Sequence, residues 1–452
     1  MKVPTIHGHS VKYINLDNAA STPILQPVVD YILEYLPWYS SVHRGTGFKS
    51  QLSTELYDYC HVRVAEFFGA DQNHNTVIFT KNTTEAINKL SFRLGLNRED
   101  YVLTSIMEHH SNDLPWRSHC NIEHIGLTKD LTLDLNHLEE LIKKHRDRVK
   151  LITITGASNV TGQMNPIYEI AEIAHRNNIP ILVDGAQLAP HRTIDVLPDD
   201  HPSHIDFLTC SGHKMYAPLG TGVLIGHKRT FERGVPEYTG GGTIKSVTTK
   251  DVYWADPPEK EEAGSPNTVG AIALKKSMDI LEEIGMEEIS QHEEELTQYI
   301  IRNLSSHPDI IIYGNTQLDR QSRVGVISFN IAGMNHALVA AILSYEYGIA
   351  VRSGCFCAHP YIHRLLNLSK GDIYQQQQQI LQSNLYNVVG MVRISFGMYN
   401  TLKEVKRFLE AIDEISSHNK DHYYLKRYFL DRKTGSYFPR DFNPNFKKYF
   451  DY

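Results

Sequence analysis

The sequence lacks most features that mark secreted, membrane-spanning or nucleic-acid-binding proteins. Its 452 residues include five cysteines, an odd number at irregular spacing, which fits reduced thiols in the cytosol better than a disulfide framework. No apolar run approaches the roughly 20 residues that span a bilayer, and the first residues form no apolar signal core. The net charge of −7 does not favour nucleic acid or an anionic membrane as a partner. We therefore expect a soluble, cytoplasmic protein, and we assign no metal site.

The pattern of the chain indicates two domains and an extension. Up to about residue 226, apolar strands alternate with helical patterns and polar residues follow the strands. This order predicts a doubly wound α/β domain with a mainly parallel sheet. The later pattern predicts a smaller α+β domain. We expect a large domain at residues 13–260, a small domain at 261–415 joined by residues 1–12, and an extension of unknown role at 416–452.

Lys214 is the residue around which the polar positions of the first domain are organised. It follows an expected buried strand at residues 207–210 and lies beside Ser211 and His213. Desolvation lowers the pKa of a lysine, so its neutral amine can attack an aldehyde and form a Schiff base. On this stretch alone, a solvated surface lysine is an equally good interpretation.

Thr83 and Thr84 follow an expected strand at residues 76–80 and begin a helical pattern. A helix N-terminus presents free N–H groups and the positive end of the helix dipole, so these hydroxyls indicate a phosphate site. Plain N-capping by one of the two threonines is the alternative interpretation.

Further polar residues follow other strands, where ligands bind in parallel sheets. Asp184 can face a ring nitrogen, His109 can stack on an aromatic ring, and Gln187 and Asn159 can bond a phenolic oxygen. With Lys214 for an aldehyde and Thr83, Thr84, Ser211 and His213 for a phosphate, these demands describe pyridoxal 5′-phosphate (PLP).

Two loops and one insertion complete the observations. His43 lies in a glycine-containing loop at residues 40–47 that suits close approach to a ligand, and we count it as a candidate substrate-binding residue. A structural or exposed histidine is the alternative. Residues 238–244 form a glycine-rich turn that suits an anion. Residues 371–384 include a run of glutamines, which predicts a mobile insertion or a polar helix.

Taken together, the motifs resemble the class V aminotransferase family of PLP enzymes with fold type I, whose large domain has a seven-stranded, mainly parallel sheet. The nearest likeness is to cysteine desulfurases and selenocysteine lyases, over residues 13–415. The matching motifs include Tyr-Ile-Asn-Leu-Asp-Asn-Ala-Ala, Val-His-Arg-Gly, Asn-Thr-Thr-Glu-Ala-Ile-Asn, Glu-His-His-Ser-Asn, Ser-Asn-Val-Thr-Gly, Val-Asp-Gly-Ala-Gln, Ser-Gly-His-Lys-Met-Tyr-Ala-Pro, Gly-Gly-Gly-Thr-Ile and Glu-Ala-Gly-Ser-Pro-Asn.

The resemblance implies a role for each matching residue. Lys214 would carry the cofactor, Asp184 would pair with its pyridinium and His109 would stack on its ring. Arg393 would grip the substrate carboxylate, with Arg352 nearby. The remaining contacts would be Gln187 and Asn159 at O3′, Thr84, Ser211 and His213 at the phosphate, and Thr243 reaching the phosphate of the partner subunit in a homodimer.

The loop from Arg352 to Pro360 decides the expected reaction. It is similar to the Arg-x-Gly-His-His-Cys-Ala-x-Pro loop of desulfurases, with Cys357 at the catalytic cysteine and with Cys355 and Phe356 in place of the two histidines. The Gly-Cys-Phe-Cys run also resembles the desulfurase domain of molybdenum cofactor sulfurases. We therefore expect conversion of L-cysteine to L-alanine, with a persulfide on Cys357 for transfer to an acceptor, which can be a protein.

Other interpretations remain open on the sequence. The changed loop and the insertion allow another class V reaction, such as that of an aminotransferase, a different C–S lyase, an epimerase-like enzyme or a selenocysteine lyase. A non-catalytic binding or scaffold protein on the same fold is the alternative of another class. For the loop itself, the alternative interpretation is that both thiols, Cys355 and Cys357, are ordinary loop residues. We count Lys214, Cys357 and His109 as the catalytic residues.

Overall fold

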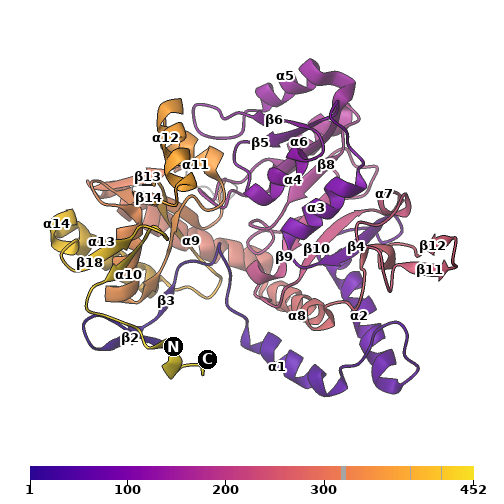
Figure 1. Cartoon of the computed structure of the whole chain (residues 1–452), viewed down its shortest axis with the longest axis horizontal. Helices are drawn as coiled ribbons and strands as arrows, with labels where there is room; N and C mark the ends of the chain where they lie inside the picture. Colours follow the sequence, from indigo (N-terminus) through magenta and orange to yellow (C-terminus); the bar gives the residue numbers. More distant parts are fainter. Residues whose placement is uncertain (317–321, 387, 419, 452) are drawn as a thin grey trace. The chain divides into compact units, whose positions relative to one another are not determined.

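The computed structural model describes residues 1–316, 322–386, 388–418 and 420–451 (Figure 1). The chain divides into two compact units, which we call unit 1 and unit 2 and describe separately. Unit 1 comprises Met1–Ala20, Asn159–Gly162 and Gln291–Tyr452, and unit 2 comprises Ser21–Ser158 and Gln163–Ser290.

A seven-stranded sheet forms the centre of unit 2, in the order β4-β10-β9-β8-β7-β5-β6. Strand β10 runs antiparallel to both of its neighbours and the other pairs are parallel, so the expected mainly parallel sheet is confirmed. The bounds are β4 Asn75–Thr80, β5 Tyr101–Ser105, β6 Asn121–Ile125, β7 Val149–Thr155, β8 Ile181–Asp184, β9 Phe207–Ser211 and β10 Gly222–His227.

The central strands are apolar because both of their faces are covered. Every residue of β8 and β9 is buried, as in parallel sheets with helices on both sides. One core cluster joins Leu90 of helix α3 and Trp116 of α4 to the strand residues Leu151, Leu182 and Leu224. The helices near this sheet are α3 Thr83–Arg93, α4 Leu114–Arg117, α5 Leu135–His145, α6 Ile167–Arg176 and α7 Lys228–Glu232.

A second layer of unit 2 is built from α1 (Gln26–Tyr35), α2 (Phe48–Phe67) and α8 (Thr268–Ile284), which pack on one another. Tyr57 of α2 and Ile272 of α8 are fully buried in their shared core. Because α8 packs on α1 and α2, the division between the units falls near residue 290, within α9 (Met286–Ser306), whereas the sequence placed a boundary near residue 260. A hairpin of β11 (Ile244–Val247) and β12 (Val252–Trp254) also belongs to unit 2.

Unit 1 is built on an antiparallel sheet of four strands in the order β13-β14-β17-β16, with a core shared by α9, α10 and α13. This arrangement agrees with the expected α+β character. The N-terminal strands β1 and β2 form a hairpin, and β3 pairs with β15. The bounds are β1 Lys2–Pro4, β2 Ser10–Lys12, β3 Ile14–Asn15, β13 Ile310–Tyr313, β14 Val326–Ile331, α10 His336–Tyr347, β15 Ile349–Ala350, β16 Arg352–Gly354, α11 His359–Leu365, β17 Met391–Ser395 and α13 Leu402–Ser417.

The two stretches without a clear sequence period both have regular structure. The glutamine run lies in α12 (Lys370–Leu381), which begins with a capping box between Ser369 and Asp372, so it forms the polar helix of the two options. The C-terminal stretch contains α14 (Lys420–Tyr424) and a hairpin of β18 (Tyr428–Asp431) and β19 (Ser436–Pro439). The fully buried Tyr428 donates its hydroxyl to Glu346 of α10 at 3.1 Å, which fixes the hairpin to unit 1.

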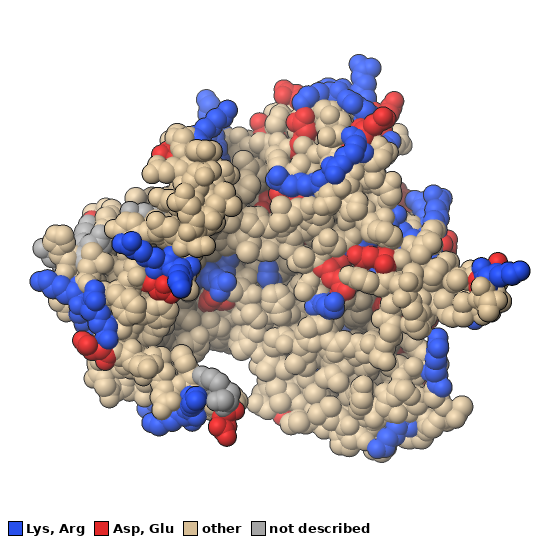
Figure 2. Space-filling model, in the orientation of Figure 1, with Lys and Arg blue, Asp and Glu red and all other residues tan. Residues whose placement is uncertain are grey.

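The surface carries charges of both signs. On the face drawn in Figure 2, basic side chains lie interspersed with acidic ones, in keeping with the small net charge. None of the helices in the described ranges combines the length and the apolarity that a bilayer crossing requires.

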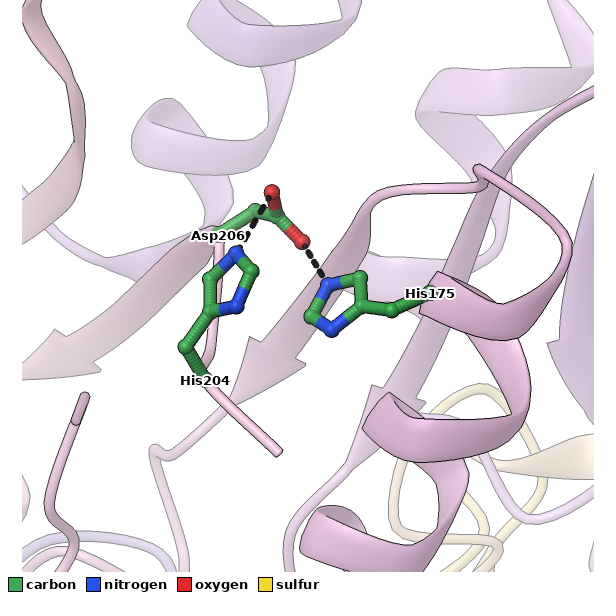
Figure 3. Close-up of side chains that lie close together, drawn as sticks. All are labelled: His175, His204 and Asp206. Carbon is green, nitrogen blue, oxygen red and sulfur yellow. Dashed lines mark hydrogen bonds and ion pairs between the residues drawn. The ribbon is translucent and has the colours of Figure 1, made fainter. Parts of the chain in front are cut away.

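One cluster of metal-capable side chains, His175, His204 and Asp206, lies before the N-terminal ends of β8 and β9 (Figure 3). Nε2 of each histidine faces the Asp206 carboxylate, at 2.9 and 3.4 Å, and each Nδ1 lies 2.8 Å from a backbone carbonyl oxygen. The two rings stack at 3.9 Å with planes 15° apart, so their nitrogen lone pairs do not converge on one point. This geometry is that of an ion-paired cluster, in which the histidines lower the pKa of Asp206 to about 2 and Asp206 raises the pKa of His204.

We expect Asp206→Asn to lower the free energy of unfolding by about 1–3 kcal/mol, because two imidazoles lose a charged acceptor. The contribution of Asp206 is present above its ordinary pKa of about 3.9, and that of His204 is present below about 6.5 and lost as the pH rises through its raised pKa. Urea unfolding should therefore show the largest difference from the unchanged protein between these two values. Asp200→Asn, at an exposed position of the same loop, is the matched control, and equal effects of the two substitutions would contradict the assignment.

Candidate active site

Hydroxyl groups from two parts of unit 2 meet at the N-terminus of α3. Oγ of Ser211, at the end of β9, lies 2.9 Å from Oγ1 of Thr83 and accepts the Thr83 backbone N–H at 2.9 Å. Asn82, rather than Thr83 or Thr84, is the N-cap residue, since its side chain accepts from the N–H of Glu85. Because Asn82 performs the capping, neither threonine hydroxyl serves as the cap, and both contact other hydroxyl groups at the helix N-terminus.

His109 is connected to this group through Ser111. Oγ1 of Thr84 lies 2.6 Å from Oγ of Ser111, which lies 3.0 Å from Nδ1 of His109. The Ser111 backbone N–H donates to the same Nδ1, so Nδ1 is an acceptor and the neutral ring carries its proton on Nε2. The structure thus brings together two residues predicted separately, one for a phosphate and one for stacking on a ring.

Asp184 ends β8 as a carboxylate that is 3% exposed. Its Oδ1 accepts the backbone N–H of Ala186 at 3.0 Å. Burial raises its pKa, while the nearby Lys214 acts in the opposite direction. Gln187, three residues beyond Asp184, is buried as well. A buried carboxylate of this kind needs a cationic partner.

Lys214 lies in a short 3-10 helix, Gly212–Lys214, directly after β9. The same turn holds His213, whose pKa burial and the adjacent lysine lower to about 4, so that this imidazole is neutral at physiological pH. The backbone oxygen of His213 accepts hydrogen bonds from Ser21 and Thr22, which fix the turn from outside the sheet. The predicted residues Lys214, Asp184 and His213 are therefore electrostatic neighbours.

Two further predicted residues of unit 2 make contacts elsewhere. His43 contacts α2, with its Nε2 2.9 Å from Oδ1 of Asp58 and its backbone N–H donating to Thr54. Thr243 is fully buried, and its hydroxyl donates to the Gly240 oxygen within the glycine-rich turn that precedes β11.

Glu108 is a residue that the sequence analysis did not single out. It is 3% exposed and precedes His109. Its carboxyl accepts from the hydroxyl of Ser105, the amide of Asn112 and the backbone N–H of Thr155. Burial raises its pKa to about 8. Glu108 thus ties the ends of β5 and β7 together and fixes the segment that carries His109.

The candidate residues of unit 1 lie around Arg393, in the middle of β17. This guanidinium is 3% exposed and donates to the Asn159 oxygen at 2.8 Å and to Asp17 at 3.1 Å. The exposed Arg352 lies 3.9 Å from the other oxygen of Asp17. Two arginines therefore share one carboxylate, which leaves a net positive charge at this place. The Asn159 side-chain amide donates to the Phe356 oxygen at 2.7 Å.

Cys357 lies in a strained turn next to Arg393. The Ala358 N–H donates to the Cys355 oxygen at 2.9 Å, and both central residues have positive φ, 50° at Phe356 and 55° at Cys357. These signs belong to a type I′ turn, which side chains of this size rarely adopt, and such strain is concentrated at functional sites. The turn exposes Cys357, whereas Cys355 is partly buried and donates its thiol to the Val389 oxygen. The Phe356 ring lies over the Arg393 guanidinium at 4.8 Å.

Known proteins resemble this chain over most of its length. A family model described as aminotransferase class-V matches residues 14–408. The chain belongs to the class V aminotransferase family. A cysteine desulfurase of Haloferax volcanii is 36% identical over 409 residues, which cover 88% of each chain. A cysteine desulfurase of Cronobacter sakazakii is 35% identical, over 91% of this chain and 94% of its own.

Solved structures of the same kind support this membership. The apo cysteine desulfurase of Thermococcus onnurineus NA1 matches with a TM-score of 0.77 and 33% identity, over 89% of this chain and 94% of its own. The cysteine desulfurase CsdA of Escherichia coli matches with a TM-score of 0.75 and 28% identity, over 89% and 94% of the two chains. The family model ends at residue 408, so the hairpin of β18 and β19 lies beyond it.

For this class V chain we expect Glu108→Gln to be tolerated and Glu108→Ala to lower the free energy of unfolding by about 2–4 kcal/mol, because alanine leaves three donors without an acceptor. The raised pKa means that the folded protein keeps the proton up to about pH 8, whereas the unfolded chain releases it near its ordinary value. This group therefore makes stability fall as the pH rises between those values. Glu108→Gln should remove that component in urea unfolding, and equal damage from the two substitutions would refute the assignment.

Proposed function

We propose that this chain is a PLP-dependent cysteine desulfurase, which converts L-cysteine to L-alanine and collects the sulfur as a persulfide on Cys357. The observation that carries the proposal is the exposed thiol of Cys357, held in a strained turn beside the buried Arg393. The cysteine desulfurases to which the chain is 34–37% identical support the choice of reaction within the family.

The residues of unit 2 fit PLP by their chemistry. Hydroxyls and backbone N–H groups at the start of the 11-residue helix α3 suit a phosphate. The buried Asp184 suits a protonated ring nitrogen as its cationic partner, and Lys214 supplies the amine. We assign the phosphate to Thr83, Thr84, Ser211 and His213, ring stacking to His109, and the O3′ side to Gln187 and to Asn159, which belongs to unit 1. When bound, PLP supplies an electron sink for carbanion chemistry at the substrate α-carbon.

The substrate carboxylate is assigned to Arg393. Its Nε is buried and has no hydrogen-bond partner within the described residues, so the guanidinium retains a donor for a ligand. Asp17 cancels only one of the two positive charges at this place, which favours an anion. Lys214 removes the α-proton of the substrate as a general base.

Sulfur transfer is assigned to Cys357. Its thiolate attacks the substrate sulfur, the carbon–sulfur bond breaks, and that electron pair remains on the carbon that becomes the methyl group of alanine after protonation. A persulfide, Cys357–S–SH, remains on the protein. Exposure of the thiol allows the sulfane sulfur to leave for an acceptor, which can be a protein.

A homodimer and a cytoplasmic location belong to the same proposal. The hairpin of β11 and β12 exposes Val247, Val252 and Tyr253, an apolar surface that a second subunit can cover. Thr243, directly before this hairpin, would then lie close to the phosphate of the partner subunit. All five cysteines are free, in keeping with a reducing compartment.

Replacing Cys357 by serine should abolish persulfide and alanine formation from L-cysteine while the absorbance of bound PLP above about 400 nm is kept. Cys355→Ser is the matched control in the same turn and should retain alanine formation. Alanine is measured by chromatography and persulfide by alkylation and mass spectrometry. Unchanged alanine and persulfide in the Cys357→Ser protein would overturn the assignment.

Replacing Arg393 by lysine should raise the KM for L-cysteine by about tenfold or more, because lysine cannot form the two-pronged contact with a carboxylate. Arg352→Lys, at an exposed position, should change the KM much less. Steady-state alanine formation gives the constants, and PLP absorbance shows that the variants are loaded. An unchanged KM in Arg393→Lys would remove this residue from the substrate site.

A further inference from the structure

A cavity of about 380 Å³ lies within unit 1, against the turn that carries the two cysteines. Cys355, Phe356 and Cys357 form one side of it. Other parts of the lining come from Ile380 of α12, from the segment after that helix, and from the hairpin of β18 and β19. The cavity is therefore bounded by the glutamine-containing helix and by the C-terminal hairpin, the two parts of the chain for which the proposed reaction gives no role.

The segment after α12 and the hairpin of β18 and β19, which both line the cavity, contact each other. The Leu385 backbone N–H donates to the Arg432 oxygen at 2.9 Å, between the segment after α12 and the turn of the hairpin. Arg432 also lies over the ring of Tyr386 at 5.2 Å. Gly435 has a φ of +69°, and a Cβ atom there would lie 3.2 Å from Leu385, so the hairpin approaches this segment closely. The cavity is thus part of a packed structure.

The cavity lining carries no lysine, arginine, aspartate or glutamate side chain among the described residues. Phe356, Ile380, Leu385 and Leu430 supply apolar surface, and the polar part of the lining comes from groups such as Asn335, Thr434 and Ser436. His336 donates Nε2–H to the Val388 oxygen at 3.0 Å, and burial lowers its pKa, so this lining residue is neutral. Burial raises the pKa of Cys355 to about 11, so this thiol also adds no charge near neutral pH.

Phe356 contacts both the Arg393 guanidinium and the cavity. Its ring lies over the Arg393 guanidinium and also lines the cavity, so it separates a cationic place from an uncharged one. A zwitterionic amino acid fits the place with Arg393 and does not fit the cavity, because burying a charge without a partner is costly. A volume of about 380 Å³ lies at the lower end of the range for small-molecule sites. The chemistry that fits the cavity is that of a small, uncharged molecule.

We propose that this cavity binds the sulfur acceptor, a small uncharged thiol, beside the persulfide on Cys357. This proposal rests on the proposed function. The acceptor sulfur attacks the outer sulfur of Cys357–S–SH, the sulfur–sulfur bond breaks, and its electron pair returns to Sγ of Cys357. Sγ takes up the proton that the acceptor thiol releases. The products are R–S–SH and the free Cys357 thiol, so atoms and electrons balance without a further reactant.

The test uses the PLP-loaded full chain and two thiols of similar size. One is the uncharged 2-mercaptoethanol and the other is the anionic 2-mercaptoethanesulfonate. Each rate of persulfide discharge is divided by the rate of the same thiol with a small-molecule persulfide, which removes differences in intrinsic reactivity. The protein should prefer the uncharged thiol by about tenfold or more, because the cavity offers an anion no counter-charge.

A charge placed in the cavity should change this preference. Ile380→Lys should slow the uncharged thiol at least severalfold and accelerate the anionic thiol. Leu381→Lys is the matched control, because Leu381 is the next residue of α12, is 78% exposed and does not line the cavity. The alanine formed in a single turnover without added thiol should be the same in all three proteins, since that step precedes the acceptor.

The outcomes separate the two proposals. Absence of alanine in the unchanged protein overturns the desulfurase assignment and this inference with it. Normal alanine with no preference between the thiols, or with Ile380→Lys and Leu381→Lys behaving alike, overturns the cavity as the acceptor site and leaves the desulfurase assignment intact. If a protein thiol discharges the Cys357 persulfide and neither small thiol does, the proposal that the cavity binds a small thiol acceptor is also overturned.

Discussion

The burial of the central strands of unit 2 is the constraint on which its chemistry depends. Strands β7, β8 and β9 are almost entirely enclosed, and the candidate site residues of this sheet stand where these strands end. Asp184 ends β8, Ser211 ends β9, and Lys214 follows one short turn later. Even there the carboxylates of Asp184 and Glu108 remain out of water, and this burial raises their pKa values. The same burial that stabilises the sheet therefore sets the protonation of the groups at its edge.

In unit 1, the buried charge that must be stabilised is the guanidinium of Arg393. Arg393 is buried in a sheet and would be costly there without Asp17, Asn159 and the aromatic ring of Phe356 around it. Asp17 also lies near Arg352, so a single carboxylate pairs with two guanidinium groups. The net charge of these three side chains is therefore positive. Through the carbonyl of Phe356, Asn159 links this charge balance to the turn that holds Cys357. A short series of contacts therefore connects the Arg393 guanidinium to the turn that holds the Cys357 thiol.

Much of this arrangement could be predicted from the sequence, where the signal is local. The apolar runs of β7 and β9, and the polar residues after them, identify the strand ends without knowledge of their partners. Strand β6 was missed because it is a half-exposed edge strand with little apolar pattern. The hairpin of β18 and β19 was missed because it depends on tertiary contacts such as Tyr428 with Glu346. Glu108 lies in a run of polar residues, and nothing in its neighbours along the chain indicates that it is buried.

The two thiols of the strained turn show why residue type alone does not assign a role. Cys355 and Cys357 are two positions apart, yet one is turned inward to the Val389 carbonyl and the other is exposed. Burial keeps Cys355 protonated and therefore a poor nucleophile, since the thiolate is the reactive form. The positive φ values at Phe356 and Cys357 are the means by which the backbone separates them, because two residues in an ordinary extended strand would place both side chains on one face. The backbone of this turn thus leaves one of two neighbouring thiols exposed and the other partly buried.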